Sequence, residues 1–487
     1  MITLKQRAFS GFLWSFIDAL GARLMQFVIG LTLARLLLPK EFGLIGMLTL
    51  FIMVSQAFVA GGFGSALIRK KDATDLDSSS IFYFNLALSA LLTGLLCLAA
   101  PWVAGFFSEP LLVPLLRVLS LLIVINAFGL VQGTLMMKAM DFKTQAKITV
   151  IASAASGAIG ISLALCGFGV WSLAYQQLAQ AIFRVALLWI FNSWRPRWAF
   201  SFDSLRCLFA FGSKMLASEL LNTIFENAYL LLIGRVFSAA DLGFYTRANT
   251  LQEMPSKTLS MVVDRVAFPL FSSIQDDLPR VKQGMKKALA ILGCLNFPIM
   301  VGLAVVAEPL VVTLLTDKWL PCVPYFQLLC VVGLLYPLHL VNLNVLKALG
   351  RSDLFLRLEI MKKVLVALNL AISWRWGISA MIAGQVIISI VSYFLNSHYS
   401  KALLGYSSIE QLGDMAPYLF TALLMGVGTY MLRLLEFHSM PLLLVVQVAT
   451  GALLFTLIAR LARLSAFLEA ETTLKDKIGG LLRPRAG

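Results

Sequence analysis

Ionisable side chains inside long apolar stretches are the first candidates for functional residues in this sequence, because a charge in an apolar environment is costly. They concentrate in two stretches, 209–234 and 244–272. At 100° per residue, the first stretch would place Glu219, Asn222 and Glu226 within about 60° on one helical face. The second carries one stripe of polar and charged residues: Thr250, Glu253, Lys257 and Asp264. If these stretches cross a bilayer, each charge costs about 2.5–3.5 kcal/mol and should face a cavity or a partner.

These charges divide by sign into two sets of candidate site residues. The candidate substrate-binding cations are Arg23, Lys214, Arg247, Lys257 and Arg265. The candidate cavity carboxylates, which could also carry a coupling ion, are Asp18, Glu219, Glu226, Glu253 and Asp264. Basic groups in a cleft of low dielectric bind anions more strongly than in water, and carboxylates there can change protonation state. We therefore expect an anion site lined by titratable groups.

Structural explanations compete for several of these positions. Glu253 and Lys257 are four residues apart and could form an ion pair that only pins helices together. Three other charged residues lie near the ends of their predicted span and could extend their side chains toward the membrane surface: Arg247, Asp264 and Arg265. Glu219 and Glu226 are harder to explain structurally, because like charges on one face gain nothing from each other.

Three further polar residues inside apolar stretches are interpreted as structural. Arg117 and Arg184 are read as anchors that reach toward the outer and inner membrane surfaces, respectively. His339 is read as a packing residue whose hydrogen bonds are satisfied. The six cysteines show no CxxC spacing and no histidine neighbours, so we interpret them as small buried apolar residues.

Composition identifies the elements that must position these groups as membrane-spanning helices. Apolar residues make up 59% of the chain and charged residues 13%, with a mean hydropathy of +0.85. Soluble domains carry about 45–50% apolar and about 25% charged residues. The long continuous apolar runs do not alternate as barrel strands do. The net charge of +15 is dispersed over short loops, which indicates a topology signal and not a nucleic-acid surface.

The apolar runs predict about fourteen spans, given the ~20 residues that a bilayer requires. They are 10–34, 43–66, 80–106, 112–137, 148–167, 170–191, 209–234, 244–272, 288–307, 322–346, 358–374, 377–396, 416–434 and 440–460. Most of the 40 lysines and arginines then lie in alternate loops, which places both termini in the cytoplasm. Ser78 and Pro196 should face the cytoplasm, and Ser108 and Lys318 the opposite side.

An internal repeat predicts two lobes. The segment 34–44 recurs as 234–244, with arginine, an acid, an apolar residue and glycine at an offset of 200. The offset contains six spans, so the halves enter the membrane in the same direction and are related by an axis along its normal. We expect a six-helix lobe over 1–206, a second over 207–400, two further spans in 401–463, and a cytoplasmic tail over 464–487.

Motifs for catalysis or metal binding are missing from the sequence. It has no Walker A loop, HExxH motif, nucleophile elbow or cluster of metal ligands. No loop is long enough to fold as an extramembrane catalytic domain. We therefore expect a protein that is not an enzyme and that uses no cofactor or metal.

Three motifs resemble the polysaccharide-transport branch of the MOP exporter superfamily, in particular its flippases for colanic-acid-type and teichuronic-acid-type glycans. They are Leu31–Met47 (LTLARLLLPKEFGLIGM), Gly61–Ile68 (GGFGSALI) and Asp241–Ala248 (DLGFYTRA). The number and order of spans extend the likeness over essentially the whole chain.

The resemblance implies a flippase that moves undecaprenyl-pyrophosphate-linked oligosaccharides across the bacterial inner membrane by alternating access. The product would be a surface polysaccharide: exopolysaccharide, capsule or lipopolysaccharide. It also implies a cationic central cavity lined by the first, second, seventh and eighth spans, and coupling to protons or sodium in some members. Lys257, helped by Arg23 and Arg247, would hold the diphosphate. Expected partners are the lipid-linked substrate, membrane lipids, and the polysaccharide polymerase and chain-length machinery.

Two other classes of protein remain open. A cation-coupled multidrug or small-molecule antiporter shares the superfamily's repeat, but it has twelve spans and lacks the polysaccharide-type motifs. A membrane scaffold that transports nothing would not explain carboxylates inside the bilayer.

Overall fold

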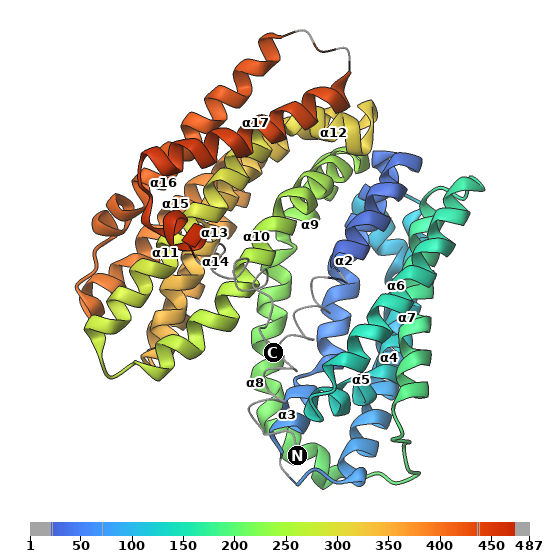
Figure 1. Cartoon of the computed structure of the whole chain (residues 1–487). Coiled ribbons are helices and arrows are strands. Elements are labelled where there is room, and N and C mark those ends of the chain that lie inside the picture. Colours follow the sequence, from blue (N-terminus) through green and yellow to red (C-terminus); the bar gives the residue numbers. More distant parts are fainter. Residues whose placement is uncertain (1–20, 22, 71, 436, 438, 473–487) are drawn as a thin grey trace, which may run out of the picture. The chain divides into compact units, whose positions relative to one another are not determined.

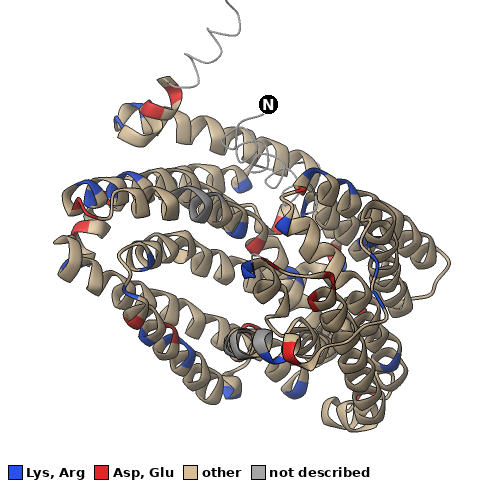
Figure 2. Ribbon diagram, turned by 90° about the horizontal axis from the view of Figure 1, so that it is seen from below, with Lys and Arg blue, Asp and Glu red and all other residues tan. Residues whose placement is uncertain are grey.

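The chain is helical in its computed structural model, which describes residues 21, 23–70, 72–435, 437 and 439–472 (Figure 1). Within those residues there is no β-strand, in agreement with the fold class predicted from composition. Most of the helical ribbon carries no charged residue, and many of the charges lie at helix ends and in loops (Figure 2). This distribution is typical of helices that cross a membrane.

Two compact units make up the chain, Met1–Thr246 and Arg247–Gly487. The boundary falls inside one helix, α10 (Ala239–Ser273), whose first two turns belong to the first unit. These units reflect local packing and do not test the repeat boundary expected between residues 206 and 207. The lobes 1–206 and 207–400, the extra pair of spans 401–463 and the tail 464–487 therefore stay predictions.

The first unit is a helical bundle in which α4 packs on α5, α6 on α7, α5 on α7, and α2 on α5, α8 and α9. Residues 23–36 are helical. The helices that follow are α2 (Pro39–Ala60), α3 (Phe63–Arg69), α4 (Asp75–Phe107), α5 (Leu112–Lys138), α6 (Phe142–Leu165), α7 (Val170–Phe191), α8 (Phe202–Glu226) and α9 (Ala228–Val236). Buried leucine, isoleucine, valine and phenylalanine fill the spaces between them.

Local chemistry explains where α2 begins and ends. Pro39 occupies its first turn, where the missing N–H costs nothing. The Glu41 carboxylate accepts a hydrogen bond of 2.6 Å from the backbone N–H of Leu38. Gly61 and Gly62 have φ angles of 50° and 69°, a left-handed conformation that favours glycine. The span expected over 43–66 is therefore broken into α2 and α3.

The second unit begins with the remainder of α10 and packs α11 against α13 and α16, and α13 against α15. Its elements are α11 (Leu278–Val305), α12 (Ala307–Leu315), the 3-10 helix η1 (Asp317–Cys322), α13 (Val323–Ala348), α14 (Ser352–Ser373), η2 (Trp374–Trp376), α15 (Ile378–Leu404), α16 (Ser408–Met431), η3 (Leu432–Leu434) and α17 (Met440–Leu461). Its core is a contiguous apolar cluster that includes Phe271, Met285 and Val345.

A buried polar network joins α13, α15 and α16 in this second unit. Gln411 is fully buried, and its Oε1 accepts hydrogen bonds from Asn342 (3.2 Å) and Tyr393 (3.1 Å). His339 Nε2 lies 3.2 Å from the Ser389 hydroxyl, and its Nδ1 lies 3.4 Å from the Asn396 amide. The interpretation of His339 as a hydrogen-bonded packing residue is therefore confirmed.

Contacts between loops match the expected alternation of sides. Arg197 forms an ion pair with Asp75 (2.7 Å), which joins the segment that contains Pro196 to the start of α4, where Ser78 lies. At the other end of the first unit, Lys40 lies 3.1 Å from Glu109. In each case, both loops were assigned to the same side of the membrane by their basic residues. Which side is cytoplasmic stays a prediction.

Nine helices in the described part of the chain are long and apolar enough to cross a membrane. Four other expected spans also fold as helices, namely α7, the α8–α9 pair, α10 and α14. Each of these four carries charged or amide side chains along its length, which makes it less apolar. Part of the first expected span, 10–34, lies outside the described residues. The total of about fourteen spans therefore stays a prediction.

Candidate functional site

Three cavities in the first unit share polar lining and meet at one side chain, Gln56 of α2. The first has a volume of about 400 Å³ and lies among α2, α5, α6 and α7. The second, of about 240 Å³, lies among α2, α5 and α7. The third, of about 370 Å³, lies among α2, α3 and α8. Pockets that bind small molecules commonly measure about 300–1,000 Å³.

Arg184 of α7 lines the first two cavities and is the single ionisable residue in their lining among those that the structure describes. No carboxylate in the described part of the chain lies within ion-pair distance of its guanidinium. At 1.5 Å per residue, Arg184 lies about 21 Å along α7 from Val170 and about 10 Å from Phe191. It is thus well inside the helix, and it lines cavities that amide side chains also line.

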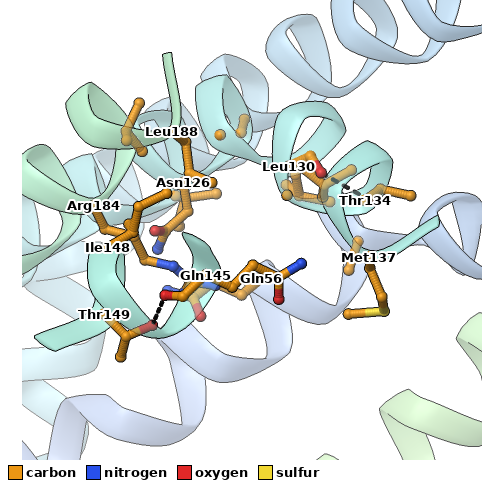
Figure 3. A pocket seen from close by; sticks show the side chains of 17 residues that line it. Gln56, Asn126, Leu130, Thr134, Met137, Gln145, Ile148, Thr149, Arg184 and Leu188 are labelled. Atoms are coloured by element: carbon orange, nitrogen blue, oxygen red, sulfur yellow. Dashed lines mark hydrogen bonds between the residues drawn. The ribbon is translucent and has the colours of Figure 1, made fainter. Parts of the chain in front are cut away.

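Amide side chains from four helices line the same cavities as this guanidinium. Gln56, Asn126 and Gln145 come from α2, α5 and α6 and project into the space near Arg184 (Figure 3). Gln177 and Gln180 of α7 line the second cavity. Amides both donate and accept hydrogen bonds, and a guanidinium donates in a fixed fork. Such a lining can bind hydroxyl groups together with one oxyanion.

One donor in this lining lacks a partner. The Nε2 atom of Gln145 is buried and makes no hydrogen bond with the described residues, whereas its backbone carbonyl accepts one of 2.9 Å from the Thr149 hydroxyl (Figure 3). A buried donor without an acceptor costs about 1–3 kcal/mol. An acceptor supplied by water or a ligand would remove that cost.

Glu219 lines the third cavity, together with Gln56 and Thr223. Its side chain is exposed in the structure. Glu226 lies two turns further along α8, just before the break at Asn227, and is not among the residues that line the three cavities. Of these two carboxylates on one face of α8, Glu219 thus lines the third cavity and Glu226 lines none of the three.

Arg23 belongs to the first unit, in the helical residues 23–36. Its Nη1 atom is buried, with no hydrogen-bond partner in the described part of the chain. The helix that carries it packs through Ile29 and Leu33 against Leu173 of α7. The candidate role of Arg23 in binding an anion stays a prediction.

Glu253 and Lys257 form an ion pair in the second unit. Lys257 Nζ lies 2.8 Å from Glu253 Oε2, and their side chains are 45% and 36% exposed. Arg247, two turns before Glu253 in α10, places its guanidinium 5.8 Å from the centre of the Trp319 ring. The structure thus supplies a local partner for each of these cations, and substrate binding by either stays a prediction.

Four candidate residues cannot be placed as side chains. Asp18 lies outside the described residues, as do the side chains of Lys214, Asp264 and Arg265. Their predicted roles stay untested. Among the described residues, no group of three histidine, cysteine or acidic side chains is arranged to hold a metal ion.

The polar residues of the first two cavities were missed as site residues. Arg184 was interpreted as an anchor near the inner surface, and Asn126, Gln145 and Gln177 were given no role. Their signal in the sequence is the presence of amide side chains inside otherwise apolar stretches, which is weaker than that of a charge because amides cost less in a bilayer.

The sequence matches one protein family and a named relative over most of its length. Residues 32–324 match the model of the family described as polysaccharide biosynthesis protein. Teichuronic acid biosynthesis protein TuaB of Bacillus subtilis is 29% identical over 467 residues, which cover 93% of this chain and 95% of TuaB.

Solved structures share the fold. The lipid II flippase MurJ, in its inward closed conformation, superposes with a TM-score of 0.77 at 13% identity, over 92% of this chain and 98% of MurJ. A multidrug resistance MATE transporter of the MOP superfamily, facing inward, gives a TM-score of 0.60 at 16% identity, over 80% of this chain and 98% of that transporter. At these identities the likeness concerns the fold.

Proposed function

Because the chain belongs to the polysaccharide biosynthesis protein family, we propose that it is a flippase for lipid-linked oligosaccharides, of the MOP superfamily. It would move undecaprenyl-pyrophosphate-linked repeat units across the inner membrane of a bacterium for the assembly of a surface polysaccharide. The observation that carries this proposal is a set of polar cavities inside a bundle of apolar helices. A glycan needs such a polar path, whereas its polyprenyl tail can stay in the lipid.

The finer architecture is part of the same proposal. We propose about fourteen spans, both termini in the cytoplasm, and two six-helix lobes related by a pseudo-two-fold axis along the membrane normal. A reciprocal contact supports the axis. A β-carbon on Gly43 would meet the carbonyl oxygen of Ala239, and one on Gly243 would meet that of Pro39. The offset of 200 residues relates Gly43 to Gly243 and Pro39 to Ala239. Each contact is therefore the counterpart of the other, as a two-fold relation requires.

Removal of the protein from its own cell tests the function. We expect glycan-loaded polyprenyl carrier to accumulate at the cytoplasmic face and surface polysaccharide to fall, because loaded carrier has no other route across. The measurement is lipid extraction followed by mass spectrometry of the carrier, with the intact gene returned as the control. Loaded carrier that still reaches the outer face at the normal rate would contradict the proposal.

A multidrug antiporter is the alternative function. The solved flippase MurJ resembles this chain over a larger share of its length than the multidrug transporter does, and with the higher TM-score. Both likenesses concern the fold, so the family match carries the choice. Drug accumulation assays on the deletion strain would reveal an antiporter through increased retention of cationic dyes.

Glu219 is our candidate for the group that binds a coupling proton or cation. Replacement Glu219→Gln should reduce gradient-driven transport by about tenfold or more while protein levels stay normal, because the amide cannot exchange a proton. The matched control is Glu226→Gln, the same change on the same helix but away from the cavities. Transport of labelled lipid-linked glycan into vesicles, with and without a pH gradient, measures the difference. Equal activity of both variants would show that Glu219 is structural.

A further inference from the structure

The first two cavities carry a charge pattern that suits one particular kind of anion. Among the described residues, their lining contains the guanidinium of Arg184 and no other ionisable group. The formal charge that these described residues give the lining is therefore that of a single cation. In a cavity of low dielectric, an anion with one negative charge would be matched, whereas an anion with two or three would leave uncompensated charge.

The hydrogen-bonding groups around Arg184 suit a sugar. Gln56, Asn126 and Gln145 approach from three helices, and each amide can donate to one hydroxyl and accept from another. None of these side-chain amides makes a hydrogen bond with the described part of the chain. A guanidinium binds a carboxylate through two parallel hydrogen bonds. Hydroxyl groups beside one carboxylate are the functional groups of a uronic acid.

We propose that this cavity is a recognition site for an acidic sugar of the transported glycan, with Arg184 binding the sugar carboxylate. The proposal rests on the proposed function and adds to it the chemical class of the cargo and its site. The site lies within the first unit and is built by α2, α5, α6 and α7. The amides of Gln56, Asn126 and Gln145 orient the ring through its hydroxyl groups, and Gln145 Nε2 gains the acceptor that the described protein does not provide.

Position in the helix supports a binding role for Arg184. A guanidinium about 10 Å from the end of its helix, without a carboxylate partner among the described residues, would be costly in lipid. Arg117 of α5 shows the structural alternative. Its Nε donates to the backbone carbonyl of Cys97 at 3.4 Å, and it is not among the residues that line these cavities.

Binding to the purified full-length protein in detergent tests the proposal without any transport step. The probes are an oligosaccharide that contains glucuronic acid, its neutral counterpart with glucose in that place, and inorganic pyrophosphate. We expect the acidic oligosaccharide to raise the melting temperature, because a ligand that binds only the folded state stabilises it. The neutral oligosaccharide should bind about tenfold or more weakly, because it lacks the partner of Arg184.

Variants test whether Arg184 causes the preference for the acidic oligosaccharide. Arg184→Gln should lose the preference for the acidic oligosaccharide, and Arg184→Lys should keep part of it, since lysine retains the charge but not the fork. Arg117→Gln is the matched control and should bind as the wild type does. If Arg184→Gln does not fold, Asn126→Leu, which removes one amide from the lining, should weaken both oligosaccharides.

Three results would overturn the proposal: equal binding of acidic and neutral oligosaccharides by the wild type, an undiminished preference in Arg184→Gln, or competition by pyrophosphate that depends on Arg184. The last would assign the cavity to the carrier diphosphate. If the acidic-sugar site is contradicted, loaded carrier is still expected to accumulate in the deletion strain. The site and the flippase function can therefore be contradicted independently.

Discussion

Replacement Gly43→Ala is expected to destabilise the protein by about 1–3 kcal/mol or more, in the range known for overpacked interiors. A β-carbon there would overlap the carbonyl oxygen of Ala239, a backbone atom that cannot rotate away. Helix α2 would have to separate from the start of α10. Thermal unfolding in detergent, followed by the loss of monodisperse protein, measures the change.

Gly94→Ala is the matched control for this change. Gly94 lies inside α4, and a β-carbon there would have nothing within 4 Å. Alanine is favoured over glycine inside a helix by about 1 kcal/mol, so this variant should be as stable as the wild type or more so. A Gly43→Ala protein that melts with the wild type would contradict the close approach.

The reciprocal contact also predicts how replacements at Gly43 and Gly243 combine. At Gly243, a β-carbon would overlap the carbonyl oxygen of Pro39. The shift of α2 that accommodates one alanine also makes room for the other. The double replacement should therefore cost less than the sum of the single replacements, as is common for residues that share one contact.

Exchange of the charges of Glu253 and Lys257 is expected to leave export lost although the protein is made. The single replacements Glu253→Lys and Lys257→Glu should each reduce export by about tenfold or more, if Lys257 binds the carrier diphosphate with charge-assisted hydrogen bonds. In the exchanged protein the ion pair can form again. Its cation, however, has moved one turn along α10, away from the place where the diphosphate would bind.

The structure sharpens this test, because it shows the pair formed: Lys257 Nζ lies 2.8 Å from Glu253 Oε2. A pair that only joins neighbouring turns of one helix should form again when its two charges are exchanged. Export of labelled glycan, normalised to protein in the membrane, is the measurement. Export restored to near the wild-type rate by the exchange would show that the pair only joins turns of the helix.

Residues close in sequence were interpreted correctly where the helix itself sets their geometry. The ion pair of Glu253 and Lys257 follows from a spacing of four residues. The turn at Gly43, with its capping acid Glu41, could be read from the order of residue types and from its recurrence at Gly243. The helical class followed from composition, because lipid leaves no partner for backbone groups outside helices and closed barrels.

By itself, then, the sequence determined the helical class and the local pairs, since each of these depends on neighbouring residues or on bulk polarity. Tertiary packing alone decided which polar side chains share a cavity. Gln56, Asn126, Gln145 and Arg184 lie on four helices, and their meeting depends on how α2, α5, α6 and α7 rotate against each other. Glu219 and Glu226 share a face of α8, yet of the two it is Glu219 that lines the third cavity, because where a cavity ends depends on the helices packed beside it.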